Sequence, residues 1–407
     1  MKIIQANKFY FPGRGAETYL FELSNWLTRQ GHEVIPFAMQ HPKNQPTPYA
    51  EYFPSFVPTE DVSLSLQSLK TFGRMFYSLE SKRKISKLVK ETKPDLCHIH
   101  NIYTQLSSSI LFALHEMNIP VVMTVHDHHL IDPSHTIPLR NYKYKKEMGI
   151  FSATFSRFYK DSYLASFAQI LRYQFERYLA PYERFIDLFF VPSNYLADRL
   201  KESGFPEEKI QVNYFGKDSC IYEPDYKHKG YILFVGSLIK GKGVEMIINI
   251  ARRLPELSFK IVGKGPDEFF LQALAKHEKN IEFTGFQTGD NLARFYKEAF
   301  IVLVPSQVHD VFPLVTLEAM LYGKPVIASR AGGIIEAIED KKTGFLVDPF
   351  DENDWIDAIE KIVSDSSLWD QFAKASYDRL RTVFSEEKHY ERVMKGYKQV
   401  LDQKKIP

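Results

Sequence analysis

The sequence predicts an α/β protein of two doubly wound, Rossmann-like domains. The first observation is length, because 407 residues can build two separate hydrophobic cores. The second is an order of strand, glycine-bearing loop, helix and strand at residues 2–37, which is typical of a parallel sheet. The third is that this order starts again at residue 231. A composition of 44% hydrophobic and 25% charged residues is ordinary for a globular protein.

The totals also exclude several classes of protein. A net charge of +2 gives no reason to expect nucleic acid as a partner. Two cysteines, Cys97 and Cys220, cannot form a disulfide framework and are typical of a reducing compartment. The N-terminal apolar run is too short for a signal peptide, and no run is long enough to span a membrane. We expect a cytoplasmic protein, with peripheral contact at the inner face of the membrane as an open alternative.

The first domain is expected at residues 1–222, with a helical, basic insertion at 130–185. The opening strand at 2–6 is followed by a loop and by a helix at 16–30, whose apolar residues recur at helical spacing. Gly31 ends that helix. The later elements expected are a loop at 42–58, helices at 78–92, 106–117 and 193–203, and strands at 32–37, 95–100, 120–125, 187–192 and 210–214.

A loop with two glycines, FPGRGAE at residues 11–17, follows the first strand. Ligands of parallel sheets bind beyond the carboxyl ends of strands, and glycine lets a backbone approach a ligand closely. Arg14 stands between the two glycines. The alternative is a tight turn chosen only for its backbone angles. A dinucleotide fingerprint fits poorly, because the third glycine and the spacing are missing.

Histidines gather at the ends of two strands. Alternation puts His98 and His100 on one face of the strand at 95–100, and the strand at 120–125 leads into His126-Asp-His-His129. A zinc site fits poorly, because no two histidines have helical i, i+4 spacing and no cysteine accompanies them. We expect no metal. Packing or capping roles for His98 and His126 remain alternatives.

The insertion at 130–185 combines basic residues with aromatic ones. It becomes helical between residues 163 and 182. One stripe of that helix holds Leu164, Phe167, Leu171, Phe175, Tyr178 and Tyr182. A basic, aromatic helix can lie on a membrane surface. Such a stripe more often packs on its own domain, which we expect here, and peripheral membrane contact through 137–185 or contact with the acceptor is the alternative.

The second domain is expected at 229–383, after a linker at 220–229. Its first strand at 231–235 leads into Gly-Ser-Leu-Ile-Lys-Gly-Lys-Gly243 and a helix from Val244. Glycines and lysines between a strand and a helix are typical of a phosphate-binding loop. This is not a Walker loop, because no Ser or Thr follows the lysine. The alternative is that Lys242 is a solvated loop residue.

A second strand–loop–helix–strand unit runs from Phe300 to Ser329, with Asp310 on the loop and Glu318 in the helix. We expect the helix to begin at about Pro313, since proline suits the first helical position. The open N–H groups of that helix start could hold an anion. The remaining elements expected are strands at 259–262, 281–285 and 344–347, and helices at 290–298, 355–363, 369–383 and, last, within 384–407.

These motifs resemble those of the retaining glycosyltransferases of family 4. The donor motif of that family has two glutamates with seven residues between them, around Phe-Gly-Leu; here Asp310 replaces the first glutamate and Pro313 the glycine. The loop with Gly15 resembles its Gly-Gly-Ala-Glu entry loop. Gly236 and Lys242 match its Gly-Arg-Leu…Lys-Gly motif, with Ser237 in place of the arginine. Gly263 to Pro266 resembles its Gly-x-Gly-Pro turn.

The resemblance implies a GT-B architecture, two domains facing across a cleft with the last helix crossing back to the first. It implies transfer of a sugar from a nucleotide-sugar donor, UDP- or GDP-linked, to a hydroxyl of a glycan or lipid-linked glycan, with retention and without metal or cofactor. Catalytic roles fall to His126, Asp310 and Lys242. The donor-binding residues implied are Arg14, Gly15, Gly236, Ser237, Lys240, Lys242, Gly265, Asp310, Phe312, Pro313, Leu314, Val315 and Glu318, and those on the acceptor side are His100, Asn101, His126 and Asp127.

By the same resemblance, Lys242 and backbone N–H groups neutralise the diphosphate, Glu318 binds the ribose and Asp310 the transferred sugar, to which His126 donates. The charge missing at Ser237 is expected from Arg14 or Lys240. Two other functions stay open: a sugar-nucleotide epimerase of the same fold, and a nucleotide-sugar-binding subunit that has lost catalysis.

Overall fold

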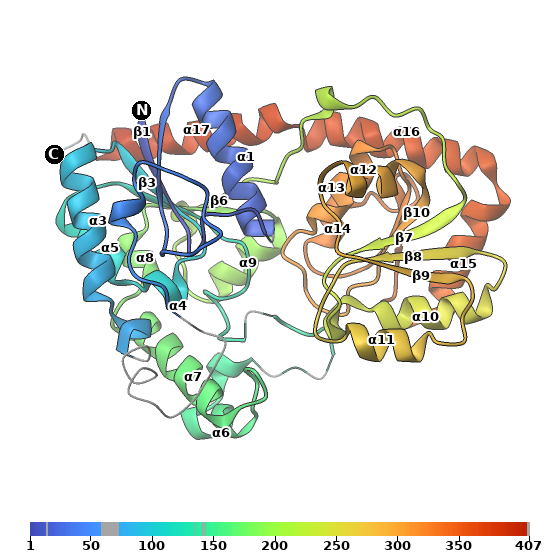
Figure 1. The fold of residues 1–407 in the computed structure, drawn as a ribbon, viewed down its shortest axis with the longest axis horizontal. Coiled ribbons are helices and arrows are strands. Elements are labelled where there is room, and N and C mark those ends of the chain that lie inside the picture. Colours follow the sequence, from blue (N-terminus) through green and yellow to red (C-terminus); the bar gives the residue numbers. More distant parts are fainter. Residues whose placement is uncertain (14, 58–72, 135, 141, 143, 405–407) are drawn as a thin grey trace.

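Two parallel six-stranded sheets form the protein (Figure 1), and they confirm the predicted fold class. The computed structural model describes residues 1–13, 15–57, 73–134, 136–140, 142 and 144–404. The first sheet has the strand order β2-β1-β3-β4-β5-β6, and the second has β12-β11-β10-β7-β8-β9. In the second sheet the strand order reverses between β7 and β10, which is where doubly wound sheets bind ligands.

The first sheet is built from Lys2–Ala6 (β1), Glu33–Phe37 (β2), Leu96–Ile99 (β3), Val121–Thr124 (β4), Leu188–Val191 (β5) and Ile210–Val212 (β6). Its helices are Gly15–Arg29 (α1), Leu79–Thr92 (α3), Tyr103–Leu106 (α4), Ser109–Glu116 (α5), Ile150–Phe155 (α6), Tyr163–Tyr178 (α7), Tyr182–Phe185 (α8) and Asn194–Glu202 (α9). Strands β3, β4 and β5 are buried along their whole length, because helices cover both faces of the sheet.

The second sheet is built from Tyr231–Val235 (β7), Ser258–Val262 (β8), Ile281–Gly285 (β9), Ala299–Val304 (β10), Val326–Ser329 (β11) and Gly344–Val347 (β12). Its helices are Val244–Arg253 (α10), Glu268–Leu274 (α11), Gly289–Glu298 (α12), Leu314–Leu321 (α13), Ile334–Ala337 (α14), Glu352–Ser364 (α15) and Ser366–Val383 (α16). Within the described ranges, no helix combines the length and the apolar character needed to cross a bilayer.

The last helix, Glu386–Gln403 (α17), leaves the second half and packs against β4 and β5 of the first sheet (Figure 1). The Tyr397 hydroxyl lies 2.6 Å from His98 Nδ1. A Cβ on Gly396 would come within 2.5 Å of the Phe190 ring, so only glycine allows this approach. The helix therefore ties the two halves together.

Three local expectations were wrong at element boundaries. The helix expected at 106–117 begins only at Ser109 (α5), because Ser107, with a φ of +60°, separates it from α4. The helix expected to reach residue 182 ends at Tyr178, since Pro181 follows. Pro313 caps α13 instead of starting it: its ψ is 111°, and its carbonyl accepts from the Thr316 N–H at 3.1 Å.

We predict that His389 on α17 makes folding sensitive to acid. Its Nδ1–H donates to the Tyr214 carbonyl at 2.7 Å, and its Nε2 accepts from the Tyr19 hydroxyl at 3.1 Å. Burial lowers the pKa of His389 to about 4. Between pH 6.5 and pH 4, His389 is protonated in the unfolded chain but not in the folded chain. The free energy of unfolding therefore decreases as the pH falls. The loss attributable to this group is about 3 kcal/mol.

The measurement is the free energy of unfolding of His389→Gln and of the native protein at pH 7, 6 and 5. As the pH falls, the free energy of unfolding of the native protein should decrease more than that of His389→Gln. The matched control is His277→Gln, because His277 is exposed. A control that shifts as much as His389→Gln would contradict the prediction.

Candidate functional site

A cavity of about 320 Å³ lies between the two halves, where the carboxyl ends of their strands face each other. The residues that line it are Gly15, Ala16, His126, Phe215, Phe234, Val235, Gly236, Ser237, Lys242, Val304, Pro305, Ser306, Asp310, Val311, Phe312, Pro313, Leu314 and Val315. They follow or end β4, β6, β7 and β10, or begin α1 and α13. Both sheets therefore contribute to one site.

Two helix N-termini meet at this cavity. Helix α1 begins at Gly15 and α13 at Leu314, and a Cβ on Gly15 would lie 3.4 Å from the Leu314 side chain. The N–H groups of Leu314 and Val315 are in the first turn of α13 and have no partner within the helix. Helix N-termini carry partial positive charge, so this part of the cavity favours an anion.

The charged pair of the cavity is Lys242 and Asp310, whose Nζ and Oδ1 atoms lie 2.5 Å apart. Lys242 ends the turn after β7, and Asp310 lies on the loop after β10. Asp310 Oδ2 is buried and has no hydrogen-bond partner among the described residues. An anionic ligand must therefore share Lys242 or draw it away from Asp310, while Oδ2 is available to accept from a ligand hydroxyl.

The loop that carries Asp310 is held from both halves. Gly333 N–H donates to the Asp310 carbonyl at 2.7 Å. Gly332 has a φ of +52°, and a Cβ there would lie 2.5 Å from the same carbonyl, so this close contact requires glycine. From the insertion, Ile137 accepts from the His309 N–H at 2.8 Å, next to a bridge between Pro138 and Val308. Backbone hydrogen bonds thus fix the main chain at Asp310, from which its carboxylate extends.

His126 ends a hydrogen-bonded chain through buried polar residues. Gln5 Oε1 lies 2.7 Å from His100 Nε2, and His100 Nδ1 lies 3.1 Å from His126 Nε2. With the Gln5 oxygen accepting, His100 Nδ1 must accept in turn, so His126 Nε2–H donates to it. The neutral His126 ring then keeps a lone pair on Nδ1. Burial lowers the pKa of His126 to about 4 and that of His100 well below its usual value.

With this orientation of the Gln5 amide, His126 Nδ1 is an acceptor. The expected donation from His126 to a ligand requires the opposite orientation. Rotating the Gln5 amide by 180° would reverse every bond of the chain and turn Nδ1 into a donor. Gln5 therefore determines which proton His126 carries, a dependence that sequence inspection did not identify.

The cavity brings together ten of the site residues expected from the sequence: Gly15, His126, Gly236, Ser237, Lys242, Asp310, Phe312, Pro313, Leu314 and Val315. Arg14 lies outside the described residues. The others are not part of the cavity lining. Lys240 is exposed, because successive residues of a 3₁₀ turn point about 120° apart and its side chain diverges from that of Lys242. Among the described residues, no second lysine lines the cavity to replace the charge missing at Ser237.

Gly265 and the acceptor-side residues have structural partners instead. A Cβ on Gly265 would lie 2.1 Å from the Leu238 carbonyl, so this glycine allows two loops to touch. His100 is fully buried behind His126, and Asn101 N–H donates to Asn7 Oδ1 at 3.1 Å. Asp127 accepts from the His129 N–H at 2.8 Å within its own loop.

Glu318 faces a neighbouring cavity of about 340 Å³, lined also by Glu22, Lys217 and Tyr296. The Tyr296 hydroxyl donates to its carboxylate at 2.7 Å, and burial raises the pKa of Glu318. The structure thus does not place Glu318 in one cavity with Asp310. However, Glu318 follows Leu314 by four residues, so it lies one turn further along the same face of α13. An extended ligand could reach both cavities.

Phe215 is an aromatic residue of the cavity wall that sequence inspection missed. The Phe215 ring is nearly parallel to that of His126, with centroids 5.9 Å apart, and meets the Phe312 ring edge-on at 6.1 Å. Phe215 and Ser306 both come shortly after strands, β6 and β10. Their position after a strand was the available signal, since the carboxyl ends of parallel strands share one edge.

Comparison with protein families identifies the chain. The model described as Glycosyltransferase Family 4 matches residues 13–218, and the model described as Glycosyl transferases group 1 matches residues 223–379. The first match alone covers half of the chain. The chain belongs to glycosyltransferase family 4.

Known relatives of this family 4 member are distant. A sulfoquinovosyl transferase of Arabidopsis thaliana is 25% identical over 342 residues, which cover 79% of this chain and 61% of the plant protein. A D-inositol 3-phosphate glycosyltransferase of Mycobacteroides abscessus is 37% identical over 140 residues, 32% of this chain and 31% of that protein. The matches thus span less than two thirds of either relative.

Solved structures show the same fold over almost the whole chain. Sucrose-phosphate synthase from Thermosynechococcus elongatus has a TM-score of 0.72 at 18% identity and covers 99% of both chains. Anabaena HepE, in complex with UDP and glucose, has a TM-score of 0.69 at 18% identity and covers 97% of this chain and 99% of its own. The GT-B fold expected from the motifs is confirmed.

We predict opposite effects on anion affinity from the two members of the ion pair. Lys242→Ala should weaken UDP binding roughly 10- to 100-fold, the effect of losing a charge-assisted hydrogen bond. Asp310→Asn should strengthen UDP binding by about two- to fivefold, because it frees Lys242 from its partner.

Isothermal titration calorimetry with UDP measures both effects. Lys240→Ala is the matched control: it removes the same charge two residues away, outside the cavity, and should leave the affinity within about twofold. An equal loss of affinity in the Lys242 and Asp310 variants would contradict the prediction.

Proposed function

We propose that this family 4 glycosyltransferase moves a hexosyl group from a nucleoside-diphosphate sugar to an acceptor hydroxyl with retention of the anomeric configuration. The observation that carries the proposal is the cavity in which Lys242 and the N-terminus of α13 face the free carboxylate oxygen of Asp310. Such a site offers cationic and N–H groups for a diphosphate and an acceptor for sugar hydroxyls.

The diphosphate is the leaving group in this proposal. As the bond from the anomeric carbon to the phosphate oxygen breaks, negative charge builds up on the diphosphate. Lys242 and the N–H groups of Leu314 and Val315 are positioned to stabilise that charge. Burial between two domains strengthens these interactions, and exclusion of water protects the donor from hydrolysis.

Proton transfer follows from the composition of the cavity. Asp310 is the one carboxylate among the described residues that line it, whereas retaining hydrolases place two carboxylates around the bond. We therefore assign the proton of the acceptor hydroxyl to the departing phosphate oxygen. The acceptor oxygen bonds to the anomeric carbon from the face that the diphosphate leaves, which retains the configuration. No metal or cofactor takes part in this scheme.

The remaining polar groups are assigned to the sugar and the ribose of the donor. Asp310 accepts from hydroxyls of the transferred sugar, and His126 contacts the same sugar from the first half. Glu318, one helical turn along α13, accepts from the ribose hydroxyls. The neighbouring cavity at Glu318 gives the nucleoside room beside the diphosphate site.

Known proteins narrow the substrates to test. HepE was solved with UDP-glucose, and two of the relatives are named as a sulfoquinovosyl transferase and as a D-inositol 3-phosphate glycosyltransferase. A UDP-linked hexose is therefore our first choice of donor, and a glycan or lipid-linked glycan our choice of acceptor, used at the cytoplasmic side.

We predict a retained anomeric configuration in the product. Incubation with an α-linked UDP-hexose and a soluble glycan acceptor should give an α-linked product, identified by the anomeric proton coupling in NMR. A β-linked product would contradict retention. An altered sugar nucleotide formed without acceptor would identify an epimerase, and UDP-sugar binding without any turnover would identify a non-catalytic subunit.

We also predict that Glu318 acts on the nucleoside and not on the diphosphate. Glu318→Ala should weaken UDP binding about tenfold and leave inorganic pyrophosphate binding unchanged, because only UDP carries a ribose. Tyr296→Phe is the control, since it removes the partner of Glu318 but keeps the carboxylate. An equal loss for UDP and pyrophosphate would show that the substitution disturbs α13 as a whole.

A further inference from the structure

A helical hairpin made of α6 and α7 carries an unusual concentration of exposed apolar side chains. It projects from the first half beyond both sheets (Figure 1). Seven of the fifteen large apolar side chains that are exposed in the described parts of the chain belong to it or directly follow it: Phe151, Phe155, Tyr163, Leu164, Phe167, Tyr178 and Leu179. Phe151 and Phe155 are 77% and 70% exposed. Clusters of this kind mark contact surfaces.

Helix α7 exposes an apolar side and buries several polar residues. The buried residues include Ser166, Gln169, Arg172 and Glu176, beside Ala165, Ile170 and Tyr173. The stripe expected to pack on its own domain does so only in part: Tyr182 is 3% exposed, but Leu164 is 49% and Tyr178 74% exposed. Soluble helices bury their apolar face, so an apolar outer face indicates that something other than water covers it.

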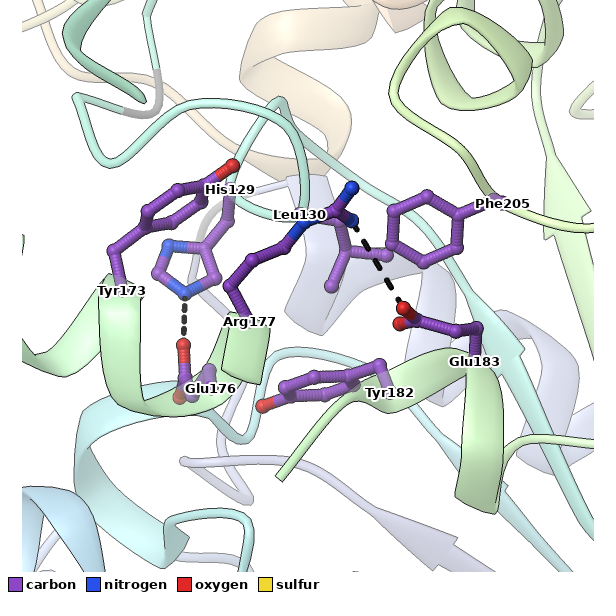
Figure 2. Close-up of a pocket in the computed structure, with 8 residues that line it drawn as sticks. All are labelled: His129, Leu130, Tyr173, Glu176, Arg177, Tyr182, Glu183 and Phe205. Carbon is purple, nitrogen blue, oxygen red and sulfur yellow. Dashed lines mark hydrogen bonds and ion pairs between the residues drawn. The ribbon is translucent and has the colours of Figure 1, made fainter. Parts of the chain in front are cut away.

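The polar inner face fixes the hairpin firmly to the first half. The Arg172 guanidinium is fully buried and bonds to Glu176 at 2.6 Å and to His129 at 2.9 Å. His129 also contacts Glu176 at 3.1 Å (Figure 2). Removing Arg172 or Glu176 would leave the other as an unpaired buried charge, which is costly. The hairpin is therefore held in one orientation.

The anchor of the hairpin lies on the loop that leads out of the proposed active site. His129 follows His126 by three residues, and the same loop continues to Ile131 and Pro133. Tyr173 donates to the Ile131 carbonyl at 3.1 Å, and Gln169 to the Pro133 carbonyl at 2.9 Å. The apolar face and the sugar-side wall of the cavity are thus attached to one loop.

The charge of the insertion favours an anionic surface. Residues 137–185 contain nine Lys or Arg and four Asp or Glu, although the whole chain has a net charge of only +2. At the hairpin itself, the Arg157 guanidinium lies over the Tyr163 ring at 5.0 Å and forms an exposed ion pair with Asp161 at 3.3 Å, and Lys160 is exposed nearby. Aromatic side chains next to basic ones are typical of helices that lie at the interface of anionic membranes.

We propose that the α6–α7 hairpin docks on an anionic phospholipid bilayer and holds the active-site cavity beside a lipid-linked acceptor. The choice of acceptor rests on the proposed function, whereas the docking does not. The exposed rings of Phe151 and Phe155 enter the headgroup region, and Arg157 and Lys160 pair with lipid phosphates. The buried Arg172–Glu176 pair keeps this face directed outward.

Sedimentation with vesicles tests the docking. The native protein should bind vesicles of phosphatidylglycerol mixed with phosphatidylcholine, and bind pure phosphatidylcholine vesicles at least about tenfold more weakly. The double variant Phe151→Ser/Phe155→Ser should lose at least about tenfold in affinity for the anionic vesicles. The matched control is Phe269→Ser, which removes a phenylalanine that is 85% exposed in the second half and should bind as the native protein does.

Two further measurements separate the docking from folding and from the proposed function. UDP affinity and melting temperature should be unchanged in the double variant, since neither residue lines the cavity. Absence of vesicle binding by the native protein would overturn the proposal, and so would an equal loss in the Phe269 control. A dimer seen by light scattering, abolished by the double variant while vesicle binding persists, would assign the surface to a second copy instead.

Discussion

The rest of the structure positions cationic groups and one carboxylate around a single cavity between the two sheets. Two helix N-termini and the Lys242 ammonium direct positive potential into the space between the sheets, and Asp310 is the anion that offsets it. In a cleft shielded from water such a balance is worth more than on a surface. A bound diphosphate would replace Asp310 as the partner of Lys242. The Asp310 carboxylate would then be available to accept hydrogen bonds from the sugar. Donor binding and preparation of the sugar site are thereby one event.

Elements far from the cavity keep its groups in place. Helix α17 joins the halves on one side, and the bridge between Pro138 and Val308 joins them on the other. The segment of that bridge continues the loop that carries His126 and anchors the hairpin. The surface proposed to bind lipid and the loop that holds the backbone at Asp310 therefore belong to one continuous stretch of chain.

Sequence inspection identified those cavity residues whose position depends only on where a strand ends or a helix begins. Lys242, Asp310 and Leu314 follow strands or begin a helix, so local order alone placed them at one edge of the sheet. It did not place Lys240 and Glu318, because the direction of a side chain in a short turn, or around a helix, depends on its neighbours. The acceptor role of His126 depends on Gln5 and His100, which are distant in sequence. Which side of α7 faces solvent could not be predicted from a stripe of apolar residues, since their spacing is the same whether the stripe is buried or exposed.

The most direct test of the central claim is a crystal structure of the protein with a UDP-hexose. We predict that diphosphate oxygens lie within hydrogen-bond distance of Lys242 Nζ and of the Leu314 and Val315 N–H groups, with the Lys242–Asp310 contact lengthened from 2.5 Å. A diphosphate bound elsewhere, with that contact intact, would contradict the claim.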